Sequence, residues 1–270
     1  MQYIGALIGD YCGSIYEWRN PHENSPDSIE ILKDGKFTDD SVLTVAIMEW
    51  LNRTNGKSVE ELPGILKDWA TNYPDAGYGG RFKTWVLSDS TEPINSFGNG
   101  SGMRVSPCAF FANTLEECLD LAKKSAEVTP NHEEGIKGAQ AIAEAIFLAR
   151  SGAGKADIKR IIEEDFDYNL SLPLNEIGTF VHKFDATCQI TVPEAIICFL
   201  NSNDFIDCIR KSIWIGGDTD TIAAMACSIA EPYFGLPHFI MEQFKNKLKT
   251  QKETDMFRTI IEFNETILKR

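Results

Sequence analysis

Long apolar runs are missing from this chain of 270 residues. No segment approaches the roughly 20 consecutive apolar residues that a membrane-spanning helix needs. The N-terminal segment carries no basic stretch, and Asp10 interrupts its apolar run earlier than in a secretory signal peptide. We therefore expect a protein that neither spans a membrane nor is exported.

Cysteines with the spacing of a metal site are also absent. The seven cysteines include no C-x-x-C pair and no neighbouring histidine at zinc-finger spacing. An odd set of this kind is typical of buried free thiols in a reducing compartment. The cytoplasm is the expected location.

Basic residues are fewer than acidic ones. The 26 lysines and arginines against 40 aspartates and glutamates give a formal net charge of −14. Such a surface repels a phosphate backbone, which argues against nucleic acid as a partner.

Alternating runs of the β type are scarce, and no Asn-Gly hairpin signal joins two of them. Apolar residues instead recur at intervals of three and four, which predicts helices. No segment resembles an interdomain linker, so we expect one all-α domain over residues 1–270. The helical patterns cover Val42–Leu51, Leu115–Val128, Ile136–Ala149, Ile158–Ile162, Val192–Leu200, Ile222–Ile229 and Met256–Leu268.

Two short acidic segments, Phe37–Ser41 and Gly216–Thr221, lie far apart in the chain but share one composition. Each places two aspartates and neighbouring hydroxyls just before an apolar helical pattern. Oxygen ligands of this kind suit magnesium, manganese or calcium. Four unpaired carboxylates in one cleft would repel one another and become protonated, whereas two divalent cations would balance their charge. The two segments together predict a single metal site.

Helix capping is the alternative for each acidic segment. Asp and Thr at a helix start accept hydrogen bonds from free backbone N–H groups and complement the positive end of the helix dipole. Either segment alone fits capping better. The doubled acids in both segments favour the metal site.

The longest predicted loop, Ser88–Gly102, ends in the glycine-rich sequence N-S-F-G-N-G-S-G and is soon followed by Arg104. Glycines at this density let backbone N–H groups approach a phosphate or diphosphate closely, and Arg104 would add positive charge. A flexible connector has the same glycine content, so both interpretations stay open. His132, at the start of a later helical pattern, fits a helix cap as well as a ligand-binding residue.

Six motifs, taken in order, resemble the ADP-ribosylhydrolase (ADP-ribosylglycohydrolase) family, which includes the dinitrogenase reductase-activating glycohydrolases. Together they extend from the N-terminus to beyond position 230. Gly102, Pro130 and Glu133 depart from the residues that are commoner in the family. The matching segments are Gly5–Asp10 with Ser14–Glu17, Thr38–Asp40, Gly77–Gly80, Ser96–Arg104, Asn131–Ala139 and Gly216–Thr221.

The resemblance implies a compact, orthogonal helical domain with two Mg²⁺ or Mn²⁺ ions in a central cleft. The metal ligands that it implies are Thr38, Asp39, Asp40, Asp218, Asp220 and Thr221. The substrate-binding residues predicted from the loop and the resemblance are Ser96, Phe97, Gly98, Asn99, Gly100, Arg104 and His132.

The expected reaction is hydrolysis of an N- or O-glycosidic bond between ADP-ribose and a protein side chain or small molecule, with release of ADP-ribose. Asp39 and Asp220 are candidates to take a proton from water, and Glu17 is the candidate to protonate the leaving group. Glu17 fits equally well as an exposed acid that ends the first helix.

Two other functions remain open at this stage. A non-catalytic protein of the same fold would bind ADP-ribose or a nucleotide without cleaving it. A metal-dependent phosphohydrolase would cut the diphosphate and yield AMP. The acceptor, whether arginine, serine, a base or a small molecule, is not encoded in the motifs.

Overall fold

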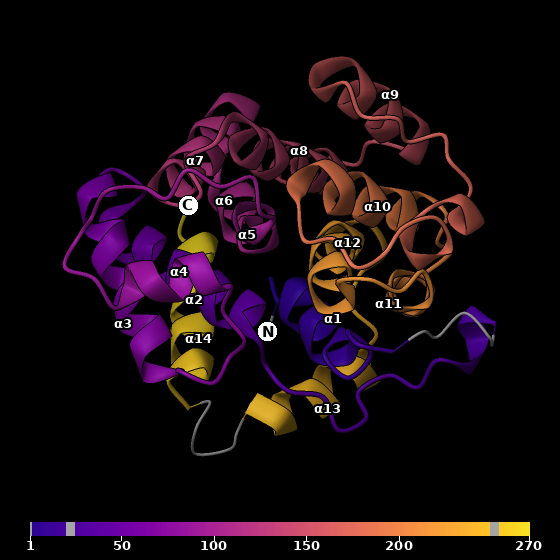
Figure 1. Cartoon of the computed structure of the whole chain (residues 1–270), viewed down its shortest axis with the longest axis horizontal. Helices are drawn as coiled ribbons and strands as arrows, with labels where there is room; N and C mark the ends of the chain where they lie inside the picture. Colours follow the sequence, from indigo (N-terminus) through magenta and orange to yellow (C-terminus); the bar gives the residue numbers. More distant parts are fainter. Residues whose placement is uncertain (1, 20–24, 249–253) are drawn as a thin grey trace.

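The computed structural model describes residues 2–19, 25–248 and 254–270, and within these ranges every regular element is a helix (Figure 1). An isolated antiparallel bridge joins Gly98 to Thr187. The prediction of an all-α fold is confirmed. The α-helices are α1 (Gly5–Gly13), α2 (Asp39–Thr54), α3 (Leu62–Asn72), α4 (Gly80–Val86), α5 (Gly100–Met103), α6 (Ser106–Phe111), α7 (Leu115–Val128), α8 (Glu133–Arg150), α9 (Lys155–Phe166), α10 (Cys188–Leu200), α11 (Phe205–Trp214), α12 (Thr219–Phe234), α13 (His238–Leu248) and α14 (Thr254–Leu268). Short 3₁₀ turns lie at Pro26–Ser28, Val59–Glu61, Leu174–Glu176 and Gly178–Phe180.

Helix α12 forms the centre of the molecule. Its residues from Thr219 to Glu231 are all buried, and α1, α8, α10 and α11 pack around it (Figure 1). A helix without a polar face is stable only when other elements cover it on all sides. The buried position of α12 follows from its sequence, which is rich in alanine and isoleucine.

Helix α1 approaches α12 more closely than ordinary side chains allow. Gly5, Gly9 and Gly13 recur every four residues on α1 and therefore lie on one face of the helix. A Cβ atom built on Gly9 would overlap the backbone carbonyl of Ala223, and one on Gly13 would overlap that of Thr219. The glycines thus set the short distance between the two backbones.

Helix α2 begins and ends on local signals. The Thr38 side chain caps its first turn by accepting a hydrogen bond from the Asp40 N–H, 3.3 Å away. At the other end Asn55 and Gly56 adopt left-handed φ angles of 53° and 68°. The cap fixes the direction in which the first turn of α2 presents its side chains.

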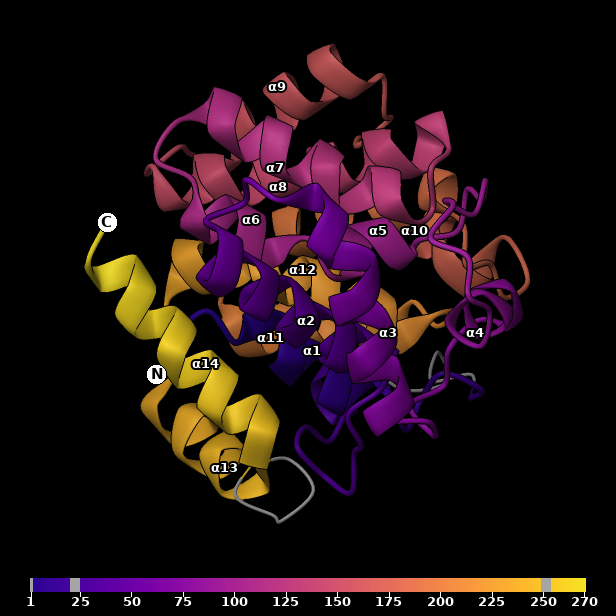
Figure 2. The ribbon, with the colours of Figure 1, turned by 90° about the vertical axis from the view of Figure 1, so that its left-hand side faces the viewer.

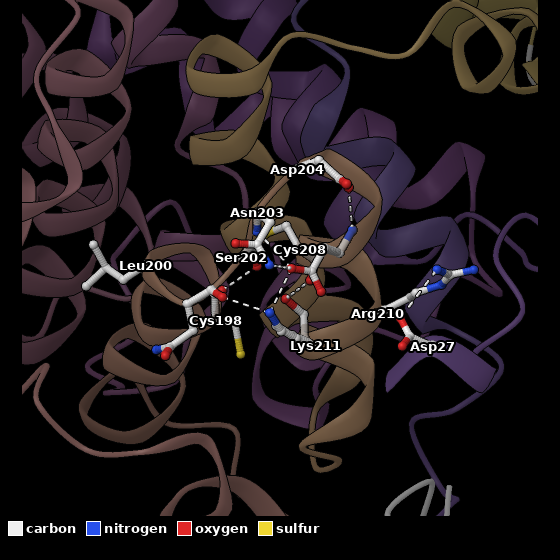
Figure 3. A network of polar contacts seen from close by, with 12 residues as sticks. Asp27, Cys198, Leu200, Ser202, Asn203, Asp204, Cys208, Arg210 and Lys211 are labelled. Atoms are coloured by element: carbon white, nitrogen blue, oxygen red, sulfur yellow. Dashed lines mark hydrogen bonds and ion pairs between the residues drawn. The ribbon is translucent and has the colours of Figure 1, made fainter. Parts of the chain in front are cut away.

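Polar contacts at the α10–α11 turn hold α11 in place (Figure 3). The Asp204 carboxylate caps α11 by accepting from the Asp207 N–H at 2.8 Å. Lys211 donates to the Asp207 carboxylate and to the Asn201 carbonyl, each at 2.7 Å. Since α11 leads directly into the segment that begins α12, this network also supports the entry into the central helix.

The last helix, α14, packs on the side of α2 and contacts the N-terminal segment (Figure 2). The Gln2 N–H donates to Asn264 Oδ1 of α14 at 2.8 Å, and the Asn264 amide donates back to the Gln2 carbonyl at 3.0 Å. Helix α9 lies on the outside and packs on α8 (Figures 1 and 2). None of the helices in the described ranges combines the length and the apolar character needed to cross a bilayer.

All seven predicted helical segments lie within observed helices. The ends differ in some places: α2 extends on both sides of Val42–Leu51, and α12 continues to Phe234 although Pro232 lies inside it. The first helix ends at Gly13, so the interpretation of Glu17 as the acid that ends this helix is wrong. The glycine-rich loop is also shorter than predicted, because its last residues form α5.

Replacing Gly9 by alanine tests the close packing of α1 on α12. The added methyl group forces the two backbones apart, and we expect a loss of about 1–3 kcal/mol in the free energy of unfolding. Chemical denaturation of the purified variant measures this loss.

Gly64→Ala is the matched control for Gly9→Ala. Gly64 lies in the first turn of α3, and a Cβ atom there meets nothing within 4 Å. This variant should be neutral or stabilised by up to about 1 kcal/mol. Equal losses in the two variants would contradict the packing account.

Candidate active site

Asp10 connects the end of α1 to the start of α2. Its Oδ1 accepts from the Thr38 hydroxyl at 2.6 Å. Its Oδ2 accepts from the backbone N–H groups of Thr38 and Ser41, at 3.0 and 3.1 Å, and from the Ser41 hydroxyl. These contacts fix the first turn of α2 against α1. No role was predicted for Asp10 from the sequence, although Asp10 ends the Gly5–Asp10 part of the first motif.

Asp40 lies where α2 meets α12. The Thr221 hydroxyl donates to Asp40 Oδ2 at 3.1 Å, and the Thr38 hydroxyl lies 3.3 Å from the same oxygen. Asp40 Oδ1 is buried and has no hydrogen-bond partner among the described residues. A buried carboxylate oxygen without a partner is costly unless a ligand satisfies it.

The acidic side chains form two groups that share Asp220. In the first group, ligand atoms of Asp10, Asp40 and Asp220 all lie within 4.8 Å of one another. In the second, the same holds for Glu17, Asp218 and Asp220. Segments nearly 180 residues apart thus meet in one place because α1 and α2 pack beside the start of α12.

Two glycines build the turn that delivers Asp218 and Asp220. Gly216 and Gly217 have φ angles of 72° and 85°, a region that L side chains rarely adopt. The chain then enters α12 with Asp218 at the N-cap position, yet the Asp218 side chain makes no capping hydrogen bond. It accepts instead from the Asn99 amide at 2.6 Å. Capping therefore explains Thr38 but does not explain Asp218.

A cavity of about 440 Å³ opens beside the acidic groups. Asp39 lines it, although it belongs to neither three-residue group within the described ranges. Lys36, Arg81, Trp18 and Phe184 also line it, and none of these four was predicted from the sequence. The predicted site residues in the cavity wall are Glu17, Thr38, Asp39, Asp40, Ser96, Gly98, Asn99, Gly100, Arg104, Asp218, Asp220 and Thr221.

The glycine-rich loop forms one wall of this cavity and is fixed at several points. The Asn99 N–H donates to the Ala186 carbonyl at 2.9 Å, and the Cys188 N–H donates to the Phe97 carbonyl at 2.9 Å. A Cβ atom on Gly100 would meet nothing within 4 Å, so the backbone there is open to a close approach. A flexible connector would lack such anchors.

Phe97 and His132 contact each other. Their rings meet edge to face with centroids 5.5 Å apart. His132 also caps α8, because its Nδ1 accepts from the Glu134 N–H at 3.1 Å. Among the described residues, neither side chain belongs to the cavity wall.

Arg104 is almost fully buried at the inner side of the cavity. Its Nη2 donates to the carbonyls of Ser125, at 2.9 Å, and Thr129. Burial lowers the pKa of its guanidinium to about 10. Its Nε has no hydrogen-bond partner among the described residues, and the Nη2 protons are directed to the end of α7.

Burial raises the pKa of every carboxyl group in the two acidic groups, and the charge of Asp220 is the next cause for all except Asp220 itself. The pKa rises to about 7 for Asp10 and Glu17. It rises to about 8 for Asp39, again through burial and then Asp220. The protein therefore holds protons at this site near neutral pH unless cations balance the charge.

The solved structure called "ADP-ribosylglycohydrolase-related protein complex" shares this fold, with a TM-score of 0.76 and 18% sequence identity over 98% of this chain and 96% of that one. The chain is 25% identical to the "ADP-ribosylhydrolase ARH3" of Mus musculus over 93% of this chain and 87% of that protein. It is also 25% identical to the ARH3 of Homo sapiens, over 93% and 89% of the two chains. The "Uncharacterized protein YegU" of Escherichia coli K12 is 27% identical, over 74% and 72%.

A sequence model described as ADP-ribosylglycohydrolase matches residues 3–267. The family model and the relatives agree on an enzyme that hydrolyses glycosidic bonds. More specifically, the chain belongs to the ADP-ribosylglycohydrolase family. The resemblance found in the sequence is confirmed.

The stability of the metal-free protein should fall as the pH rises from about 4 to about 8. The pKa values of Asp10 and Asp39 lie at about 7 and about 8 in the folded protein, above the 3.8 of an unperturbed aspartate. In this window the folded state retains protons that the unfolded state has released, so raising the pH favours unfolding. Melting temperatures measured in chelator across this pH range test the expectation, and the stabilisation by added Mg²⁺ or Mn²⁺ should grow over the same range.

Asp40→Asn tests whether the acidic groups, rather than ionisable residues elsewhere in the protein, cause this pH dependence. The variant removes one buried charge, so without metal it should gain stability relative to wild type at about pH 8 but not at about pH 5. A constant difference between the two proteins across this range would contradict the assignment.

Proposed function

We propose that this protein hydrolyses the glycosidic bond between ADP-ribose and an acceptor, releases ADP-ribose, and depends on two divalent cations. The observation that carries the proposal is the sharing of Asp220 between two groups of three acidic residues beside one cavity. Family membership supports the glycosidic bond as the bond that is cleaved. The ADP-ribosyl group in the family's name supports ADP-ribose as the substrate class.

The donor set fits hard divalent cations. All candidate ligands offer oxygen, which suits Mg²⁺ and Mn²⁺, and the orphaned Asp40 Oδ1 supplies a free donor atom. When bound, the cations would balance the carboxylate charge, coordinate ribose hydroxyls and lower the pKa of a water molecule. The residues that would hold them are Thr38, Asp39, Asp40, Asp218, Asp220 and Thr221. Asp10, whose two oxygens accept from Thr38 and Ser41, would instead position Asp40 and the first turn of α2.

Glu17 is the proposed general acid. It lines the cavity, and burial, the first cause of its raised pKa, favours the protonated carboxyl group that a proton donor needs. A protonated carboxyl group next to the scissile bond can donate its proton to the leaving group as the oxocarbenium-like transition state forms.

Asp39 and Asp220 are the proposed acceptors of the proton that the attacking water loses. Asp39 would accept this proton in addition to holding a cation, and it is the less constrained of the two, because in the described ranges it lines the cavity without belonging to either acidic group. Asp220 takes part in both groups and is therefore assigned chiefly to metal binding.

The glycine-rich loop is the proposed diphosphate and ribose site. Ser96, Gly98, Asn99 and Gly100 line the cavity, and Gly100 faces open space. Gly79 and Gly80 also line the cavity and face open space, so a ligand can approach the backbone there as well. Phe97 with His132, at the outer edge of this loop, and Arg104, below it, complete the proposed substrate site.

A reducing cytoplasm remains the proposed compartment. The seven cysteines are all free and buried, and burial raises the pKa of those that line the core, such as Cys12 and Cys188, to about 12. Thiols in this state react poorly with oxidants and do not pair.

Incubation with ADP-ribosyl-serine and ADP-ribosyl-arginine peptides tests the reaction. We expect metal-dependent release of ADP-ribose from at least one peptide, seen by mass spectrometry, and no release in chelator. Asp218→Ala should abolish release and remove the thermal stabilisation by Mg²⁺ or Mn²⁺.

Asp204→Ala is the matched control, since Asp204 caps α11 outside the cavity. Loss of a cap costs about 1 kcal/mol but should leave the metal response intact. AMP as the product would support phosphohydrolysis instead, and tight ADP-ribose binding without any cleavage would support a binding protein.

Glu17→Gln tests the general acid. The amide keeps the shape of the side chain but has no acidic proton, so kcat should fall by about 100-fold or more while ADP-ribose binding is retained. Glu176→Gln, at an exposed position in a 3₁₀ turn, is the control. Unchanged turnover at saturating substrate in Glu17→Gln would remove Glu17 from the mechanism.

A further inference from the structure

Two aromatic side chains stack at the cavity next to Glu17. The rings of Trp18 and Phe184 have centroids 4.7 Å apart and an interplanar angle of 16°. Both residues line the cavity. They come from segments more than 160 residues apart, one following α1 and the other preceding α10.

The stack contributes little to the core. Trp18 is 76% exposed and Phe184 is 39% exposed, so the contact between them hides only part of each ring. Most of the Trp18 ring therefore remains available to a ligand. Large aromatic rings left open beside a cavity are typical of binding surfaces.

The backbone around Phe184 is fixed. The His182 ring bonds to the buried Glu194 carboxylate, with 2.8 Å between Nε2 and Oε1. Two residues after Phe184, the Ala186 carbonyl accepts from the Asn99 N–H of the glycine-rich loop. The segment around Phe184 is thus bonded to α10 on one side and to the glycine-rich loop on the other. The Phe184 ring therefore gives Trp18 a fixed surface on which to stack.

Trp18 is also linked to the proposed general acid. Glu17 is its neighbour in the sequence, and both residues line the cavity. The leaving group must lie within reach of Glu17 if that residue protonates it. The open ring of Trp18 is therefore beside the place where the leaving group lies.

We propose that Trp18 and Phe184 form the leaving-group subsite and favour substrates whose leaving group has a flat conjugated face over those with an aliphatic hydroxyl. This inference rests on the proposed function. A flat group can stack on the indole ring, and a flat cation gains further from the ring and from the acidic surroundings. A serine side chain offers no such face.

The test compares two peptides of one sequence that carry ADP-ribose on arginine or on serine. The guanidinium is flat and conjugated, whereas the serine oxygen is not. The measured quantity is the ratio of kcat/KM for the arginine peptide to that for the serine peptide. Trp18→Phe disturbs the neighbouring Glu17 as Trp18→Leu does but keeps a flat ring, so comparing the ratios of these two variants separates loss of the flat face from an altered proton supply.

Trp18→Leu, which keeps an apolar side chain but removes the flat face, should lower the ratio about tenfold, the scale of one stacking contact. Trp18→Phe keeps a flat face and should retain the ratio within about threefold. Phe184→Leu should lower the ratio as well, because Trp18 loses its support. The control is Phe239→Leu, which alters an exposed aromatic residue on α13 away from the cavity wall.

An unchanged ratio in both Trp18→Leu and Phe184→Leu would overturn the proposal, as would a wild-type protein that cleaves only the serine peptide. If wild type cleaves neither peptide, the proposed function has failed. Calorimetry then measures how tightly wild type and Trp18→Leu bind the two uncleaved peptides. If the proposal holds, the preference for the arginine peptide over the serine peptide falls in Trp18→Leu. An unchanged preference would overturn it.

Discussion

The contact between α1 and α12 through Gly5, Gly9 and Gly13 is the constraint on which the site depends. Because no Cβ atoms separate the two helices, Asp10 at the end of α1 comes within ligand distance of Asp220 on α12. Asp10 then accepts hydrogen bonds from the first turn of α2, which brings the carboxylate of Asp40 next to those of Asp10 and Asp220. One run of glycines therefore determines where three separate segments place their carboxylates.

The cluster of buried carboxylates lowers the stability of the fold. Apolar burial around α12 holds the fold together, while the buried carboxylates repel one another and favour protonation. Cores normally avoid such clusters, and a cluster that persists beside a cavity points to a role in binding or catalysis. The hydroxyls of Thr38, Ser41 and Thr221 reduce the repulsion by donating to the carboxylates.

Much of the fold could be predicted from the sequence, because the long helices show clear periodicity. Helices α3, α11 and α13 were missed, although their apolar residues follow a helical spacing, and the short helices α4, α5 and α6 were missed because they span too few turns to show a period. The motifs named most of the acidic residues, but several contacts depend on the three-dimensional path of the chain. Nothing in the sequence indicated that Phe184 meets Trp18, or that the end of α7 accepts the hydrogen bonds of Arg104.

The hydrogen bond from Asn99 to Asp218 has a thermodynamic consequence. It ties the loop proposed to hold the diphosphate to a carboxylate of the acidic groups. Whatever changes the position or charge of Asp218 changes the orientation of the loop, and ordering the loop changes the carboxylate in return. By thermodynamic linkage, a ligand bound at the loop and a ligand bound at the acidic groups change each other's affinity by the same factor. The order in which the two ligands bind therefore affects the rate of binding but not the equilibrium.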